Sequence, residues 1–199
     1  MRRVTLQESN LTPNFIGSWS IEPSSVCDEL IHYFETHKED QNIGYTAKGK
    51  NLEIKDRIDI SMNPKKINLP GNEVFNTYIH SLFECYKDYL IEWPFLQNIG
   101  KNMEIPAFNL GRYNRGQHFQ GLHSERSSLQ TLHRVFAWMT YLNDVQDGGE
   151  TFFSHYDLKI KPKKGLTIIW PAEWTHAHKG NVLLKGEKYM ITGWMNFLK

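Results

Sequence analysis

A histidine and a carboxylate lie two residues apart near the middle of the chain, at His123 and Glu125. On an extended strand, residues two apart project to the same face, so this pair would present an imidazole and a carboxylate to one point. Two more histidines, His176 and His178, follow about fifty residues later. Two histidines and one carboxylate form the facial triad that binds iron(II) in non-heme enzymes and leaves coordination positions open. The spacing therefore predicts a metal site built from these two segments.

The segment from Lys188 to Phe197 is predicted to be a strand with two different faces. Tyr189, Ile191 and Met195 lie on the more apolar face, which we expect to contact the helices, so Lys188 points to the opposite side. A buried lysine is costly unless it pairs with an anion, and one interpretation is that Lys188 binds a carboxylate ligand. The alternative, a lysine exposed to solvent at the end of a strand, fits the pattern equally well.

The elements that must position these residues change in type along the chain. Apolar residues at helical spacing predict two helices. The first is expected to be capped by the hydroxyl groups of Ser24 and Ser25 and to run to about residue 38, and the second to be capped by Asn72 and to end at Pro94. From residue 105 onward the pattern is that of strands, and the best of them are 105–113, 132–142, 165–170 and 188–197. Helices followed by strands predict an α+β fold in which the helices cover one face of a β core.

Two stretches in the first half of the chain fit this scheme less clearly. Residues 15–21 are interpreted as a strand or an anchoring segment. Residues 39–70 contain several helix and strand breakers, with short strands predicted at 52–54 and 58–60. Long loops in compact domains are often functional, so a substrate lid and an ordinary surface excursion both remain open for 39–70.

The composition limits the class of protein. The 199 residues, with 40% hydrophobic and 13% aromatic side chains, indicate one globular domain. A formal charge of +1 gives no support for a nucleic-acid partner. No apolar run approaches the roughly 18 residues that span a bilayer, so we expect a soluble protein that does not bind membranes. Two cysteines and an N-terminus without a signal-peptide core lead us to expect a cytoplasmic location.

Several motifs in the second half of the chain occur together in a fixed order. They are YLNDV at 141–145, GGETF at 148–152, KG at 164–165 and GEKY at 186–189, followed by Trp194. In this combination the segment 111–197 resembles the catalytic domain of prolyl 4-hydroxylase-like 2-oxoglutarate- and iron(II)-dependent oxygenases. The resemblance implies a double-stranded β-helix, or jelly-roll, core at about 105–199, with helical support at about 1–104.

The resemblance also implies roles for individual residues. It makes His123, Glu125 and a downstream histidine the ligands of iron(II), and Lys188 the partner of the distal carboxylate of 2-oxoglutarate. Tyr141 and Thr151 match positions near that cosubstrate. The family usually has aspartate where this chain has Glu125, and this chain has one extra residue between 116–117 and His123. The charge of the ligand is retained.

His176 and His178 would lie on the same face if their segment were extended, so the residues alone leave the distal ligand open. In the resembled pattern the distal histidine precedes the cosubstrate lysine by ten positions, which makes His178 the ligand. His176 is then expected to support the site or to face the substrate. Trp194 and Arg126 are candidates for the substrate side, although Trp194 is equally compatible with the core.

The activity implied is a dioxygenase reaction that consumes 2-oxoglutarate and O2, oxidises a substrate by hydroxylation and releases succinate and CO2. The substrate is open: peptidyl proline follows from analogy alone, and a small organic molecule, another side chain or a nucleic-acid base fits the same core. Two other classes remain. A zinc-dependent hydrolase uses similar ligands, although the usual His-Glu-x-x-His motif is absent. A catalytically silent jelly-roll binding module is the other, because a fold does not guarantee a function.

Overall fold

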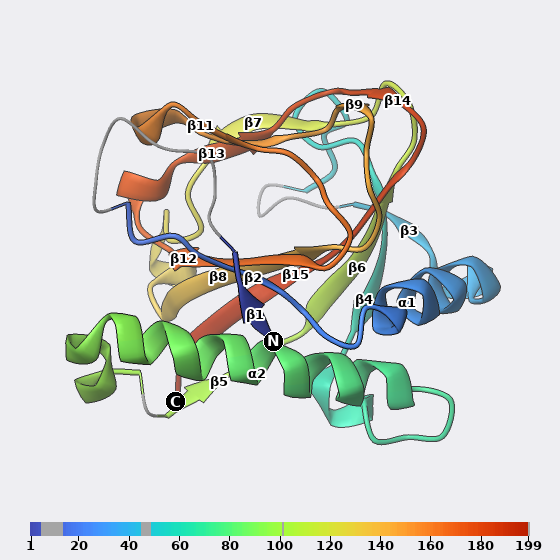
Figure 1. Ribbon diagram of the computed structural model, residues 1–199. Helices are drawn as coiled ribbons and strands as arrows, with labels where there is room; N and C mark the ends of the chain where they lie inside the picture. The colour runs from blue at the N-terminus through green and yellow to red at the C-terminus, as the bar shows by residue number, and fades with distance from the viewer. Residues whose placement is uncertain (5–13, 45–48, 101, 199) are drawn as a thin grey trace.

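The computed structural model describes residues 1–4, 14–44, 49–100 and 102–198. Its strands form a nine-stranded, a four-stranded and a two-stranded sheet, and every strand pair is antiparallel. The two larger sheets lie opposite each other as two layers, and helix α2 crosses the outer face of the larger one (Figure 1). The predicted α+β class with a double-stranded β-helix core is confirmed.

The larger sheet forms one wall of the cavity described below. In spatial order its strands are β1 (Arg2–Arg3), β2 (Gly17–Ser20), β12 (Leu166–Pro171), β8 (Arg134–Tyr141), β15 (Lys188–Phe197), β6 (Phe108–Tyr113), β4 (Ile58–Met62) and β3 (Asn42–Ile43), and β5 (Met103–Glu104) pairs with the end of β15. The long strand β15 lies at the centre, where it pairs with both β8 and β6. Its bounds are those predicted from the alternation of side chains.

The smaller sheet lies opposite and supplies the other wall. Its strands, in spatial order, are β11 (Leu158–Ile160), β10 (Thr151–Phe153), β13 (His178–Gly180) and β7 (Phe119–His123), and a separate pair is formed by β14 (Leu183–Lys185) and β9 (Asp147–Gly148). Gly148 and Gly149 both have φ of 72°, a left-handed conformation that glycine adopts without steric cost. The chain therefore bends tightly next to the short strand β9.

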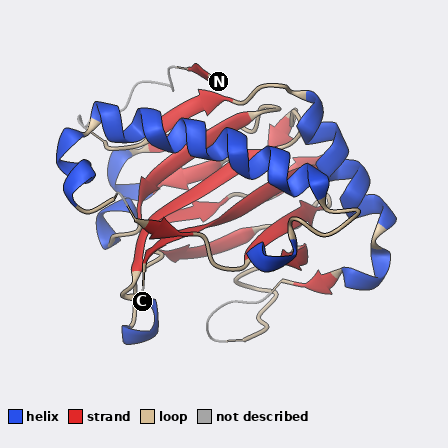
Figure 2. Cartoon of the chain, turned by 90° about the horizontal axis from the view of Figure 1, so that it is seen from below, coloured by secondary structure: helices blue, strands red, loops and turns tan. Residues whose placement is uncertain are grey.

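Two α-helices and six 3-10 turns complete the described chain. They are α1 (Ser25–Thr36), α2 (Glu73–Glu92), η1 (Lys38–Asp40), η2 (Pro64–Lys66), η3 (Pro94–Asn98), η4 (Leu129–Thr131), η5 (Ser154–Tyr156) and η6 (Trp174–His176). Both α-helices lie along the outer side of the larger sheet (Figure 2). Among the described residues, no helix has both the length and the apolar composition required to span a bilayer.

The buried apolar residues form two clusters, one on each side of the larger sheet. The first lies between that sheet and the helices and contains Tyr189 and Ile191 of β15. The second lies between the two sheets and contains Met190. Alternate residues of β15 thus point to opposite sides, as the sequence predicts, and Lys188 lies on the same side as Met190.

The first half of the chain departs from the predictions in three places. Residues 52–54 form a turn and no strand, whereas β2 and β4 join the larger sheet, so the first half is not only helical support. Helix α1 follows Ser24, but the Ser24 side chain makes no capping hydrogen bond. Asn72 precedes α2, but its side chain accepts a hydrogen bond from the Tyr33 hydroxyl and donates to the Lys66 carbonyl. Both side chains therefore mark a helix start without capping it.

Candidate active site

Three predicted metal ligands come together at one end of the space between the sheets. His123 ends β7 and His178 begins β13, and these two residues are direct partners across the strand pair. Their ring centroids are 4.5 Å apart. Glu125 lies two residues beyond the end of β7, and one ligand atom from each of the three residues lies within 4.8 Å of the other two. Among the described residues, no other group of three histidines, cysteines or carboxylates meets this condition.

Backbone carbonyls fix the orientation of both imidazoles. Nδ1 of His123 donates to the carbonyl of Gly121 at 2.7 Å, and Nδ1 of His178 donates to the carbonyl of His176 at 2.9 Å. A carbonyl can only accept, so both Nδ1 atoms carry a proton, which leaves Nε2 as the nitrogen that can face a metal in the neutral ring. Burial, and then the neighbouring His178, lower the pKa of His123 to about 4, so this ring is neutral at pH 7. The pair has the tautomer that metal ligation requires.

The two oxygens of Glu125 have different environments. Oε1 faces the imidazoles, at 3.4 Å from Nε2 of His178 and 3.8 Å from Nε2 of His123. Oε2 accepts a hydrogen bond from Nε1 of Trp194 at 2.5 Å and lies 3.6 Å from the Arg134 guanidinium. Burial alone raises the pKa of Glu125, but the contacts with His178, His123 and Trp194 outweigh it and lower the pKa to about 2. One oxygen is thus held by the protein, and the ionised carboxylate turns the other toward the histidines.

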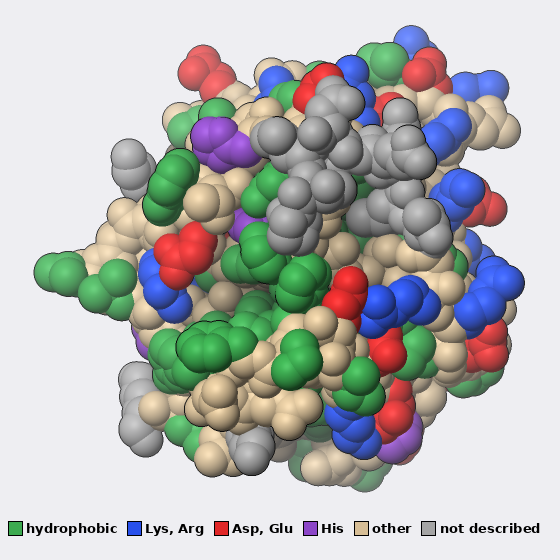
Figure 3. All heavy atoms as spheres, turned by 60° about the vertical axis from the view of Figure 1, so that its left-hand side comes forward, with side chains coloured by type: hydrophobic (Ala, Val, Ile, Leu, Met, Phe, Trp, Pro, Cys, Tyr) green, Lys and Arg blue, Asp and Glu red, His purple; other side chains and the backbone are tan. Residues whose placement is uncertain are grey.

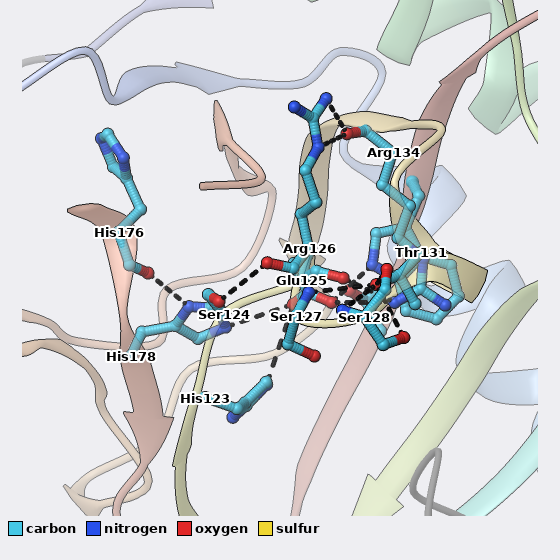
Figure 4. Close-up of polar contacts among 12 residues, drawn as sticks. His123, Ser124, Glu125, Arg126, Ser127, Ser128, Thr131, Arg134, His176 and His178 are labelled. Atoms are coloured by element: carbon cyan, nitrogen blue, oxygen red, sulfur yellow. Dashed lines mark hydrogen bonds and ion pairs between the residues drawn. The ribbon is translucent and has the colours of Figure 1, made fainter. Parts of the chain in front are cut away.

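His176 lies outside this cluster. Its ring nitrogen Nε2 donates to the carbonyl of Asn14 at 2.8 Å, and its ring points away from His123 and His178 (Figure 4). The segment is not extended throughout, because 174–176 form the 3-10 turn η6 and only His178 belongs to a strand, so the two histidines do not share a face. His176 contributes its backbone carbonyl, which orients His178.

A cavity of about 470 Å³ between the sheets contains the three residues at one side and Lys188 at another. The Lys188 side chain is buried, with 2% of its surface exposed, so the solvent-exposed alternative is wrong. Its ammonium donates to the carbonyl of Gly149 at 2.9 Å and lies 4.0 Å from the centre of the Tyr113 ring. Burial, and then the charge of Arg57, lower the pKa of Lys188 to about 7. Among the described residues, Lys188 has no ion-pair partner.

The two residues predicted to lie near the cosubstrate occupy different positions. Thr151 lines the cavity. Tyr141 is fully buried and does not line it, because its hydroxyl donates to Thr151 Oγ1 at 2.6 Å from behind. Tyr141 thus lies directly behind Thr151, and its place near the cosubstrate stays a prediction.

The two residues predicted for the substrate side, Trp194 and Arg126, also lie in different places. Trp194 lines the cavity, whereas Arg126 points away from it and bonds the carbonyl of Arg134 and the carboxylate of Glu173. Arg126 belongs to a second hollow of about 420 Å³ that is lined mostly by apolar side chains. Hydrophobic side chains gather across the middle of the face drawn in Figure 3. No described group of metal-binding side chains occurs in this second hollow, so the first cavity is the candidate active site.

The sequence predictions missed a second charged group in the cavity wall. Lys55 and Arg57 line the cavity, and both form ion pairs with Asp59. These three residues alternate along the chain up to and into β4, which places their side chains on one face. This alternation of charged residues was the signal in the sequence that could have indicated the group. The segment 39–70, considered as a possible lid, thus contributes cavity walls, while its residues 45–48 lie outside the described part of the chain.

The donor set fits the groups that the sequence implies. Two imidazole nitrogens and a carboxylate oxygen, with no thiolate among the described neighbours, suit iron(II) in a facial triad. A desolvated ammonium facing the same cavity suits one carboxylate of a dicarboxylic cosubstrate such as 2-oxoglutarate.

Comparison with known proteins finds similarity to one family. Residues 108–196, which include all three triad residues and Lys188, match the 2OG-Fe(II) oxygenase superfamily. Prolyl 4-hydroxylase 13 of Arabidopsis thaliana is 30% identical over 115 residues, covering 45% of this chain and 42% of the plant protein. The alpha-1 subunit of Gallus gallus prolyl 4-hydroxylase is 26% identical over 98 residues, covering 46% of this chain and 18% of the subunit. The matched part thus spans less than half the length of these curated relatives.

Solved structures show the same fold over nearly the whole chain. A prolyl-4-hydroxylase of Pseudomonas putida has a TM-score of 0.72 at 15% identity and covers 96% of each chain. A collagen prolyl hydroxylase of Paramecium Bursaria Chlorella virus-1, solved with 2OG, has a TM-score of 0.67 at 19% identity and covers 94% of this chain and 98% of the viral one. The segment 108–196, just under half of the chain, is thus similar to the 2OG-Fe(II) oxygenases, and the chain shares the fold of these prolyl hydroxylases.

Proposed function

We propose that the protein is a 2-oxoglutarate- and iron(II)-dependent dioxygenase that hydroxylates an organic or peptidyl substrate and releases succinate and CO2. The observation that carries this proposal is the combination within one cavity of three ligand atoms within 4.8 Å and a buried lysine. A zinc-dependent hydrolase would need the ligand atoms but would have no use for Lys188. A silent binding module would need neither.

The proposal assigns a task to each of these residues. His123, His178 and Glu125 would hold iron(II), and Lys188 would bind the distal carboxylate of 2-oxoglutarate. The iron and the cosubstrate, when bound, supply the oxidative chemistry by coupling decarboxylation of the oxo acid to activation of O2. Thr151 lines the same cavity as Lys188 and is held by the Tyr141 hydroxyl, so it offers a fixed polar contact.

The chain's own contribution is binding, orientation and exclusion of water. Met139, Met190 and Trp170 line the cavity with apolar surface. Such surface limits access of water to the reacting groups and strengthens the electrostatic contacts made there. The hydrogen bond from Trp194 to Glu125 holds the carboxylate in place before any metal arrives.

A peptidyl substrate is one candidate. A prolyl hydroxylase of Trichoplax adhaerens, with a TM-score of 0.72 at 16% identity over 94% of this chain and 85% of its own, was solved with a peptide fragment of a hypoxia inducible factor. This likeness supports testing peptides. Exposed Leu122 at the cavity wall offers apolar surface that an extended chain could contact.

The test is release of succinate from 2-oxoglutarate by the purified protein, supplied with iron(II) or with zinc(II) and with panels of peptides and amino acids. We expect succinate with iron and none with zinc. Anaerobic addition of iron(II) and 2-oxoglutarate should also produce the weak visible charge-transfer band of a chelated 2-oxo acid. Absence of this band, with a melting temperature unchanged by either component, would contradict the proposal.

A further inference from the structure

We propose that Arg126 is a positioning residue for the metal site, which acts through the neighbouring ligand Glu125 and touches neither the metal nor the substrate. This inference rests on the proposed function and deepens it, because it concerns the carboxylate that would hold iron(II). The sequence made Arg126 a candidate for the substrate side, whereas in the structure its guanidinium bonds other parts of the protein.

The three triad residues differ in how their backbone is held. His123 and His178 are direct partners across the pair of β7 and β13, so the sheet fixes both of them. Glu125 lies beyond the end of β7 and belongs to no strand. A glutamate side chain also has more rotamer freedom to lose than most side chains. Its carboxylate therefore reaches a defined point only if other contacts fix this residue.

Arg126 and Arg134 hold the two ends of the segment 125–134 by reciprocal hydrogen bonds. Nε and Nη2 of Arg126 both donate to the carbonyl of Arg134, at 2.8 Å and 2.6 Å (Figure 4). In return, Nη1 of Arg134 donates to the carbonyl of Glu125 at 3.1 Å. Each arginine side chain thus bonds the backbone at the opposite end of the segment. These bonds take the place of the strand partner that Glu125 lacks.

Arg126 also joins this segment to the end of β12. Its backbone N–H donates to the carbonyl of Ala172 at 2.9 Å, and its Nη1 donates to the carboxylate of Glu173 at 2.5 Å. All three guanidinium nitrogens are therefore bonded within the protein. Because a guanidinium is planar and its donors have a fixed geometry, these partners define the orientation of the Arg126 side chain.

The Arg134 side chain connects these backbone bonds to the carboxylate. Its guanidinium lies 3.7 Å from the centre of the Trp194 ring and 3.6 Å from Oε2 of Glu125, the oxygen that Trp194 also bonds. Without the Arg126 side chain, the carbonyl of Arg134 would lose two bonds, and the groups around Oε2 would be held less firmly. Partners that orient a metal ligand typically contribute roughly 10–100-fold to metal affinity.

The first experiment measures iron(II) affinity in the absence of oxygen, by competition with a coloured chelator, in the unmodified protein and in three variants. Arg126→Gln should weaken iron binding about tenfold, because the support of Glu125 is lost. Arg126→Lys keeps a charge beside Glu173 but cannot donate two bonds from one plane, so a loss of about threefold is expected. Arg112→Gln should stay within about twofold of the unmodified protein.

Arg112→Gln is the matched control for this experiment. Like Arg126, Arg112 forms an ion pair with a partly exposed glutamate, here Glu35 at 2.8 Å, but among the described residues it contacts no member of the triad. The two glutamine variants thus remove the same charge and a similar ion pair. Only a positioning role lowers the iron affinity of the folded protein in one variant and leaves it unchanged in the other.

The second experiment tests whether Arg126 acts through Glu125. Arg126→Gln is combined with Glu125→Ala, and zinc(II) is the probe because it binds more tightly than iron(II) and keeps a two-histidine site measurable. Arg126→Gln should weaken zinc binding about tenfold when Glu125 is present and less than about twofold when it is absent. The affinity for 2-oxoglutarate at saturating iron(II) should change less than about twofold, because Arg126 does not line the cavity.

Three outcomes would overturn the inference. One is an iron affinity in Arg126→Gln equal to that of the unmodified protein. Another is an equal loss in Arg112→Gln, which would assign the effect to general destabilisation. A third is a loss of zinc affinity that persists in the absence of Glu125. If circular dichroism shows that Arg126→Gln does not fold, Arg126→Lys decides the same comparisons. If the unmodified protein binds no iron at all, the proposed function fails and this inference fails with it.

Discussion

The metal-binding end and the Lys188 end of the cavity have opposite effects on the charged form of a buried side chain. At the metal-binding end, Glu125 has contacts with two imidazoles, an indole and a guanidinium, and its pKa is lowered to about 2. At the other end, Lys188 bonds only a neutral carbonyl and contacts an aromatic ring among the described residues, and burial followed by Arg57 lowers its pKa to about 7. The protein stabilises the first charge and destabilises the second.

This difference shows how the two ends are prepared for their ligands. The metal-binding end is an anion ready for a cation at any pH above about 4, because Glu125 is ionised and His123 is neutral there. The Lys188 end gains its full charge only when an anion arrives to stabilise it. Iron binding is therefore expected to depend on preset geometry, and 2-oxoglutarate binding on the charge of one side chain.

The largest expected effect separates the two histidines of 176–178. His178→Ala should weaken iron binding by roughly a hundredfold or more and abolish succinate formation, because it removes one of three ligands. His176→Ala should retain iron, since it keeps the backbone carbonyl that orients His178. Iron affinity and succinate release, measured on both variants, check this. The reverse pattern would contradict the metal-binding end as described.

The next effect tests the other end of the cavity. Lys188→Ala should weaken 2-oxoglutarate binding by at least about tenfold, since a charged hydrogen bond contributes roughly 1.5–3 kcal/mol. Iron affinity should be unchanged, because Lys188 contacts no triad residue. Calorimetric titration of each ligand gives both values. Equal 2-oxoglutarate affinity in the variant would show that the cosubstrate carboxylate binds elsewhere.

A smaller effect tests the support of Glu125. Trp194→Phe keeps the aromatic surface but removes the hydrogen bond to Oε2, and should weaken iron binding by about tenfold. The affinity for 2-oxoglutarate, measured at saturating metal, should change little. If iron affinity were unaffected, the contact with Arg134 would be sufficient to hold the carboxylate, and the contrast between the two ends would rest on Arg134 and the histidines alone.

The smallest effect is a difference in pH dependence. Lys188 is charged below its pKa of about 7 and loses its proton as the pH rises through that value, so 2-oxoglutarate binding should weaken with rising pH. Between pH 7 and pH 8 the protonated fraction, and with it the affinity, should fall roughly fivefold. Glu125 and His123 do not titrate in this range. A pH-independent affinity, or the same slope in Lys188→Ala, would assign the proton to another group.

The sequence determined the parts that depend on local periodicity. Alternation along 188–197 predicted both the strand and the inward direction of Lys188, because successive side chains on a strand point to opposite faces. The apolar stripe of 73–92 predicted α2, and Pro94 predicted its end. The motif series predicted the jelly-roll core. Each of these signals lies within a short stretch of chain.

Tertiary structure decided what depends on contacts between distant segments. Only the turn at 174–176 separates His176 from His178, and only the packing of Thr151 against Tyr141 moves that tyrosine behind the cavity wall. The alternation of the charged residues at 55–59 is visible in the sequence, but their burial is not, because charged side chains are usually exposed to solvent. They are buried because β4 pairs with β6 and Gly111 leaves room for Asp59, an arrangement that joins residues about fifty positions apart.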